Sequence, residues 1–131
     1  MILGLYAKEY TKCKNTMDAV KAELIAMGHT VLYLDNLETE EYIDRILSFG
    51  GDGTMLATAS FAVKKGIPML GVNLGNVGFL AYMNESDEPS QIANALLSNK
   101  FENRIMLDIK FNGKEYTALN EVFVGRNSPK P

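Results

Sequence analysis

The sequence has few of the residues that mark disulfide-linked, zinc-binding or nucleic-acid-binding proteins. Its 131 residues include one cysteine, Cys13, and one histidine, His29. A single cysteine forms neither an internal disulfide nor a cysteine-rich zinc site, so we expect the reducing cytoplasm as its location. Thirteen basic residues against sixteen acidic ones give a net charge of −3. A weakly acidic chain is a poor candidate for binding nucleic acid through its phosphates.

Long apolar runs are also absent. No stretch reaches the roughly eighteen apolar residues that indicate a transmembrane helix, and the N-terminal segment has neither a basic region nor a long apolar one. We therefore predict no membrane span and no secretory signal. Apolar residues make up 47% of the chain and charged residues 22%, which is the balance of a globular domain with enough apolar side chains to fill a core.

Short apolar runs and helical patterns alternate over the first hundred residues. The apolar runs predict strands at residues 2–6, 30–34, 46–49 and 67–72. An acidic segment, 35–44, follows the second run and is typical of a solvated loop or short helix, with metal binding as the lesser alternative. The alternation predicts an α/β fold: an open, mostly parallel, doubly wound sheet with flanking helices.

Three helices are expected between and after these strands. The first carries an apolar stripe and has Asn15 as N-cap and Gly28 as C-cap; the stripe is Met17, Val20, Leu24 and Met27. The second covers residues 54–65 and is closed by Gly66. The third covers residues 86–97, with Ser86 or Asp87 as its cap and Pro89 in its first turn.

The pattern changes in the last thirty residues. Apolar and polar side chains alternate over residues 105–111, Asn112-Gly113 is a strong hairpin turn, and residues 115–124 form the returning strand. We predict an α/β nucleotide-binding domain over residues 1–100. Residues 101–131 would be the opening hairpin of an incomplete antiparallel β domain, so we expect the chain to be the front part of a longer protein.

Glycine is concentrated where ligands bind in open α/β sheets. Seven of the eleven glycines lie between Gly50 and Gly78, after two predicted strands. The first cluster is Gly50-Gly51-Asp52-Gly53-Thr54. It is either a tight turn in which Asp52 or Thr54 caps the next helix, or a phosphate-facing loop whose carboxylate accepts a proton from a hydroxyl or holds magnesium.

Two further segments have unusual polar or glycine content. The first runs Gly71-Val72-Asn73-Leu74-Gly75-Asn76-Val77-Gly78-Phe79-Leu80, and its Phe79 is either core or a surface on which a purine stacks. The second is Ala118-Leu119-Asn120-Glu121, whose polar pair fits an exposed edge or a site for sugar hydroxyls. In a regular strand Asn120 and Glu121 point to opposite faces, so one ligand meets both only where the strand bends.

These three segments, in this order, resemble the NAD kinase family. The resemblance covers residues 45 to 126. It implies transfer of a phosphoryl group from ATP or polyphosphate to the 2′-hydroxyl of the adenosine ribose of NAD, which makes NADP. It also implies that Mg²⁺ comes with the phosphoryl donor and has no dedicated protein site. Small-molecule nucleotides are the expected partners, without nucleic acid or membrane, and the whole protein is expected to be a homodimer or homotetramer.

The resemblance also assigns roles to residues. Asp52 matches the catalytic acid–base residue, and Gly53 beside it would contact the dinucleotide. The other residues expected to bind substrate are Gly50, Gly51, Thr54, Leu56, Phe79, Asn120 and Glu121. Among them, Leu56 and Phe79 would border the NAD pocket, and the Asn-Glu pair would bind its ribose.

Two alternatives stay open. The chain could be a non-catalytic NAD- or nucleotide-binding fragment, since members of the family have a longer second domain that completes the site. It could also be a diacylglycerol-type lipid kinase, which shares the Gly-Gly-Asp-Gly-Thr loop. Replacing Asp52 distinguishes an enzyme from a binding module, because only an enzyme would lose turnover while keeping most of its affinity.

Overall fold

The computed structural model describes residues 1–75, 81–99, 106–111 and 113–119. The chain divides into two compact units, Met1–Phe101 and Glu102–Pro131. In the second unit, strands β6 (Met106–Phe111) and β7 (Lys114–Leu119) pair antiparallel. The larger antiparallel domain expected around them stays a prediction.

The first unit is built on a five-stranded sheet in which every pairing is parallel. Its strands are β1 (Ile2–Ala7), β2 (Thr30–Leu34), β3 (Arg45–Gly50), β4 (Met69–Asn73) and β5 (Met83–Asn84), and their order is β2-β1-β3-β4-β5. The central strand β3 is buried along its whole length, which explains its continuous apolar run. The four strands expected from the sequence are confirmed, whereas the two-residue β5 is too short to produce a pattern.

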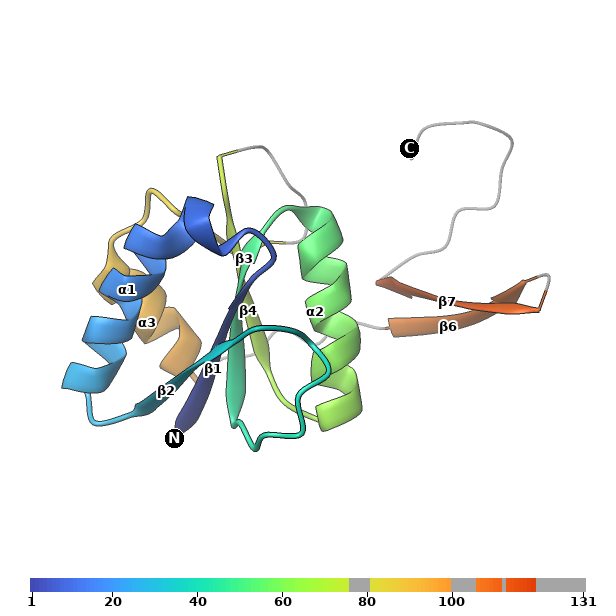
Figure 1. Ribbon diagram of the computed structural model, residues 1–131, viewed down its shortest axis with the longest axis horizontal. Coiled ribbons are helices and arrows are strands. Elements are labelled where there is room, and N and C mark those ends of the chain that lie inside the picture. The colour runs from blue at the N-terminus through green and yellow to red at the C-terminus, as the bar shows by residue number, and fades with distance from the viewer. Residues whose placement is uncertain (76–80, 100–105, 112, 120–131) are drawn as a thin grey trace. The chain divides into compact units, whose positions relative to one another are not determined.

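Helices cover both faces of this sheet. Helices α1 (Tyr10–Ala26) and α3 (Pro89–Leu97) lie on one face, and α2 (Asp52–Lys65) lies on the other (Figure 1). Two hydrophobic clusters result. Leu47 and Phe49 of β3 join the cluster under α1 and α3, whereas Ile46 joins the cluster under α2. The doubly wound α/β fold predicted from the sequence is therefore confirmed.

Helix α1 begins earlier than the sequence pattern suggests. Its N-cap is Glu9, so the expectation that Asn15 caps it is wrong. The reason is that the buried stripe starts one turn before Met17, at Cys13, whose side chain is only 1% exposed. The last member expected in the stripe, Met27, is the C-cap and is exposed.

Glycines lie at the ends of the first two helices, but the C-cap of α1 is Met27, so the expectation that Gly28 is the C-cap is wrong by one residue. Gly28 follows the C-cap of α1 with φ of 90°, and Gly66 is the C-cap of α2 with φ of 66°. Each is followed by an N–H that reaches back five residues: His29 donates to the Leu24 carbonyl at 3.1 Å, and Ile67 donates to the Ala62 carbonyl at 3.0 Å. This arrangement satisfies carbonyls at the helix end and requires a left-handed residue, which glycine adopts without steric cost.

The start of α3 differs from expectation by one or two residues. Glu88 is the N-cap and Pro89 is the first helical residue, so neither Ser86 nor Asp87 caps the helix. The side chain of Gln91 accepts the Glu88 N–H at 3.3 Å. Asp87 instead accepts the N–H of Asn84 at 2.8 Å. Asp87 and Glu88 are adjacent acidic residues before Pro89, so the sequence alone does not show which of them is the N-cap.

A buried arginine secures the other end of α3. Arg45, at the start of β3, is 9% exposed. Its guanidinium donates to the carbonyls of Leu96 at 2.8 Å and Ser98 at 2.7 Å, and to Asn99 Oδ1 at 3.1 Å. The cation meets carbonyls at the helix C-terminus, where the helix dipole favours positive charge, and hydrogen bonds compensate its desolvation.

The acidic segment 35–44 is a loop, as predicted. Asp44 accepts the N–H of Ile2 at 2.7 Å and the hydroxyl of Tyr42 at 2.8 Å. Both bonds lower the pKa of the Asp44 carboxyl, and the bond from the Ile2 N–H has the larger effect.

In the part of the chain that the structure describes, no helix is long and apolar enough to cross a membrane.

Replacing Gly66 tests the helix ending. Alanine in the left-handed region is strained, so we expect Gly66→Ala to lower the free energy of unfolding by about 1–2 kcal/mol. Urea unfolding followed by circular dichroism measures the change. An unchanged midpoint would contradict the assigned left-handed conformation.

Candidate functional site

The strand order creates one topological switch point. β1 and β3 are neighbours, but the chain leaves β1 through α1 towards β2 and leaves β3 through α2 towards β4, over opposite faces of the sheet (Figure 1). Ligands of open α/β sheets bind in the crevice beyond the carboxyl ends of the strands at such a point. Here those ends are Ala7 and Gly50, so the glycine-rich loop lies at this edge.

The loop passes directly from strand to helix. β3 ends at Gly50, Gly51 is the N-cap of α2 with φ of −95° and ψ of −170°, and Asp52 is the first helical residue. The N-cap position is thus occupied by glycine, so the interpretation in which Asp52 or Thr54 is the N-cap residue is wrong. Asp52 is half-buried in the first turn of the helix.

Two glycines let the first turn of α2 approach the sheet. A Cβ at Gly50 would lie 2.7 Å from both Cβ and Oγ1 of Thr54. A Cβ at Gly71, on β4, would lie 2.5 Å from Met55 Sδ and 3.2 Å from the Cα of Ala81. A Cβ at either position would force its neighbours to shift, so both glycines permit the close packing of α2 on the sheet.

The other two glycines of the loop have no such requirement. A Cβ at Gly51 or Gly53 would meet nothing within 4 Å. Glycine inside a helix costs about 1 kcal/mol relative to alanine, so Gly53 weakens α2 with no packing reason within the described residues. Glycine also permits close approach of a ligand to the backbone, and its exposed N–H groups at a helix start favour an anion.

The strands on either side of β3 add two polar residues to this edge. Asn73 is the last residue of β4, pairs in register with Gly50 and is 8% exposed. Lys8 follows β1 directly and is exposed. Sequence reasoning did not assign either residue to the site, although both mark the ends of predicted strands. Together with Asp52 they place an amide, an ammonium and a carboxylate at the carboxyl edge.

The start of α1 contains no activated nucleophile. Glu9 pairs with Lys12 at 2.6 Å, and this pairing lowers the pKa of Glu9 and raises that of Lys12. Burial, followed by the nearby carboxylates of Glu85 and Glu9, raises the pKa of the Cys13 thiol. Cys13 therefore stays protonated at neutral pH and packs in the core, as expected for a structural cysteine.

The structure brings together six of the nine expected site residues. They lie on the loop and the first two turns of α2: Gly50, Gly51, Asp52, Gly53, Thr54 and Leu56. The other three, Phe79, Asn120 and Glu121, lie outside the described residues. Among the residues described, no three acidic, histidine or cysteine side chains converge to hold a metal ion.

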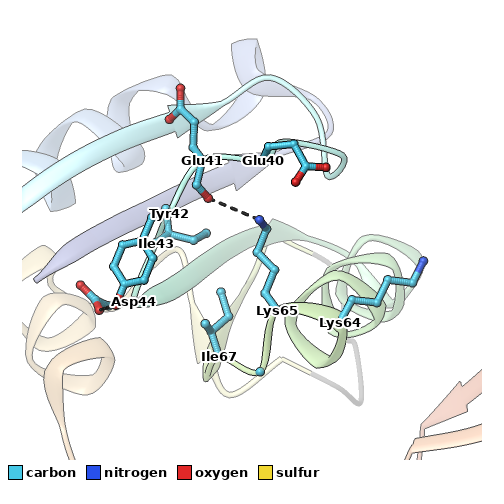
Figure 2. Close-up of a pocket in the computed structure, with 9 residues that line it drawn as sticks. Glu40, Glu41, Tyr42, Ile43, Asp44, Lys64, Lys65 and Ile67 are labelled. Atoms are coloured by element: carbon cyan, nitrogen blue, oxygen red, sulfur yellow. Dashed lines mark hydrogen bonds between the residues drawn. The ribbon is translucent and has the colours of Figure 1, made fainter.

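An open hollow elsewhere on the first unit contains none of these residues. Figure 2 shows that it is lined by residues 40–44, which precede β3, and by residues 64–67, at the end of α2. The Nζ of Lys65 lies 3.4 Å from the Glu41 carbonyl oxygen across it. The hollow is thus at the amino end of the sheet, opposite the switch point, where this fold does not place its ligands.

Comparison with known proteins identifies the family. The model of the ATP-NAD kinase N-terminal domain matches residues 5–101, well over half of the chain. The chain belongs to the ATP-NAD kinase family. The matched range includes the end of β1, all of α1 and the whole glycine-rich loop, so the likeness extends upstream of the motifs that suggested it.

Curated relatives named NAD kinase agree with this assignment. The chain is 34% identical over 124 residues to the NAD kinase of Acetivibrio thermocellus, covering 89% of this chain and 43% of that protein. It is 35% identical over 118 residues to that of Chloroherpeton thalassium, covering 86% and 40%. With that of Ruminiclostridium cellulolyticum, identity is 40% over 90 residues, covering 63% and 31%. The chain therefore spans less than half the length of these kinases.

Two glycine substitutions test the division of roles within the loop of this kinase-family domain. We expect Gly53→Ala to raise the free energy of unfolding by about 0.5–1 kcal/mol, because alanine favours the helix and meets no atom. Gly50→Ala should lower it by about 1–3 kcal/mol through overpacking against Thr54. Urea denaturation of both variants checks the opposite signs. Equal effects would contradict the separation of packing glycines from ligand-facing ones.

Proposed function

We propose that this chain carries the phosphoryl-transfer half of an NAD kinase site. The whole protein would transfer a phosphoryl group from ATP or polyphosphate to the 2′-hydroxyl of the adenosine ribose of NAD. Family membership supports the reaction class. The observation that carries the proposal is the loop at the switch point, where Asp52 stands between Gly51 and Gly53, two glycines whose missing side chains leave open space.

Each part of the loop suits one part of the reaction. A ribose hydroxyl is a weak nucleophile at neutral pH, and a carboxylate within hydrogen-bond reach orients it and accepts its proton. In the proposed step the 2′-oxygen bonds to the terminal phosphorus of the donor, the bond to the leaving phosphate oxygen breaks, and the hydroxyl proton passes to Asp52. Phosphoryl transfer asks little more of a protein than such positioning and charge neutralisation.

The surrounding residues would bind and orient the substrates. Gly53 would let the dinucleotide approach the backbone, and Leu56 would line the pocket from the second turn of α2. We propose that Phe79 borders the NAD site and that Asn120 and Glu121 bind its ribose. We further propose that the whole protein acts in the cytoplasm as a homodimer or homotetramer.

Magnesium has no assigned site on this chain. The described residues offer no converging set of carboxylates for it, and Mg²⁺ is commonly held through substrate phosphates with few protein ligands. We propose that Mg²⁺ comes with the phosphoryl donor, and the proton transfer to Asp52 does not involve it.

Of the two alternatives, the binding fragment has support from an observation. The chain covers only 31–43% of the kinases compared above, so it could bind NAD without turning it over. The lipid-kinase alternative rests on the shared loop alone. The family match and the curated relatives, all named NAD kinase, favour the dinucleotide substrate.

Replacing Asp52 tests the proposed role directly. The purified chain is incubated with NAD, ATP and Mg²⁺, and NADP formation is followed with an NADP-specific dehydrogenase. Asp52→Asn keeps the size of the side chain and removes its basicity, so we expect turnover to fall about 10²- to 10⁴-fold while the NAD dissociation constant changes little.

The exposed Glu88, at the start of α3, provides the matched control. Glu88→Gln makes the same carboxylate-to-amide change outside the loop and should leave turnover unchanged. Full turnover by Asp52→Asn would contradict the assigned base. Saturable NAD binding without turnover in the unmodified chain would instead assign it as the non-catalytic fragment.

A further inference from the structure

Two buried hydroxyl groups lie behind the glycine-rich loop. Ser48 is on β3, two residues before Gly50, and Thr58 is in the second turn of α2; both are 0% exposed. Their oxygens are 2.7 Å apart. The neighbours of Ser48 along β3, Leu47 and Phe49, are apolar and fully buried, so a polar side chain at this position needs an explanation.

The direction of the hydrogen bonds follows from the groups present. Thr58 Oγ1 lies 2.8 Å from the Thr54 carbonyl oxygen, which can only accept, so the Thr58 hydroxyl donates its proton there. The Thr58 oxygen is then available only as an acceptor. Ser48 must therefore donate to Thr58, and the strand is linked through two directed bonds to the first turn of α2.

These bonds form part of a closed ring of contacts. Ser48 bonds to Thr58, Thr58 bonds to Thr54, and the Thr54 side chain occupies the space that a Cβ at Gly50 would need. Gly50 follows Ser48 by two residues on the same strand. The segment 51–53 joins Gly50 to Thr54, so both of its ends are held, one on the strand side and one on the helix side.

We propose that Ser48 and Thr58 are positioning residues that hold the segment 51–53 at the carboxyl edge of the sheet, so that its N–H groups as well as the Asp52 carboxylate face the dinucleotide. This inference rests on the proposed function and deepens it. Apolar side chains would also fill the space between β3 and α2, but apolar packing has little directionality. A chain of two hydrogen bonds selects one rotation of the first turn of α2, and the direction of Asp52 depends on that rotation.

The test compares Thr58→Val with Thr58→Ser. Valine keeps the shape of threonine and removes the hydroxyl, whereas serine restores the hydroxyl. The N–H of Met55 donates to the Gly51 carbonyl at 3.0 Å. Its hydrogen-exchange rate therefore measures how often the loop opens. Its rate is divided by that of Leu47, a buried amide of the central strand that reports global opening.

The matched control is Val20→Ala, in the core under α1 on the opposite face of the sheet. It destabilises the fold without touching the loop, so it speeds global opening and should not raise the ratio of exchange rates. We expect Thr58→Val to raise this ratio about fivefold to tenfold and to weaken NAD binding by a similar factor, as measured by titration. Thr58→Ser should restore both values.

The exchange ratio and the NAD affinity together distinguish a failure of this inference from a failure of the proposed function. Thr58→Val with an unchanged exchange ratio overturns the inference, and so does a raised ratio with unaltered NAD affinity, since the hydroxyl pair would then be structural only. If the unmodified chain binds no NAD, the proposed function fails for this chain. The exchange ratio with its serine rescue then decides whether the ring holds the loop.

Discussion

The close contact between the first turn of α2 and the ends of β3 and β4 determines how the site is arranged. The contact leaves no room for a side chain at Gly50 or Gly71, and it brings Met55 into the core with 1% exposure. Because the helix begins immediately after the strand, its first N–H groups and Asp52 have to lie at the carboxyl edge. The parallel order of the strands then makes that edge the switch point of the sheet.

The sequence predicts the sheet well because a buried parallel strand leaves a clear apolar run. All four expected strands are found, and Gly66 is the C-cap of α2 as expected. Helix starts are less predictable. The N-caps of α1 and α3 are Glu9 and Glu88, and glutamate is not among the residues that the N-cap position favours. The pairing of Asn73 with Gly50 and of Ser48 with Thr58 depends on strand register and helix rotation, which no local pattern contains.

The four glycines of the site differ in what they contribute. Gly50 and Gly71 permit packing, whereas Gly51 and Gly53 face open space. Gly53, which lies inside α2, also lowers the stability of the helix. Local sequence choices that oppose the fold are expected at functional sites. Family membership, established over residues 5–101, agrees with this interpretation, and the ligand that we propose for these glycine positions is a dinucleotide. In the function proposed above, the chain provides the base and the phosphate-facing loop of an NAD kinase site.

We propose that the dinucleotide binds at the loop that follows β3. The most direct measurement is a titration of the ¹⁵N-labelled chain with NAD, followed by amide chemical shifts. Saturable shifts are expected at Gly51, Gly53 and Asn73, whereas the amides of residues 40–44 and 64–67 around the opposite hollow should not shift. Saturable shifts confined to that hollow, or no saturation at the loop, would contradict this proposal.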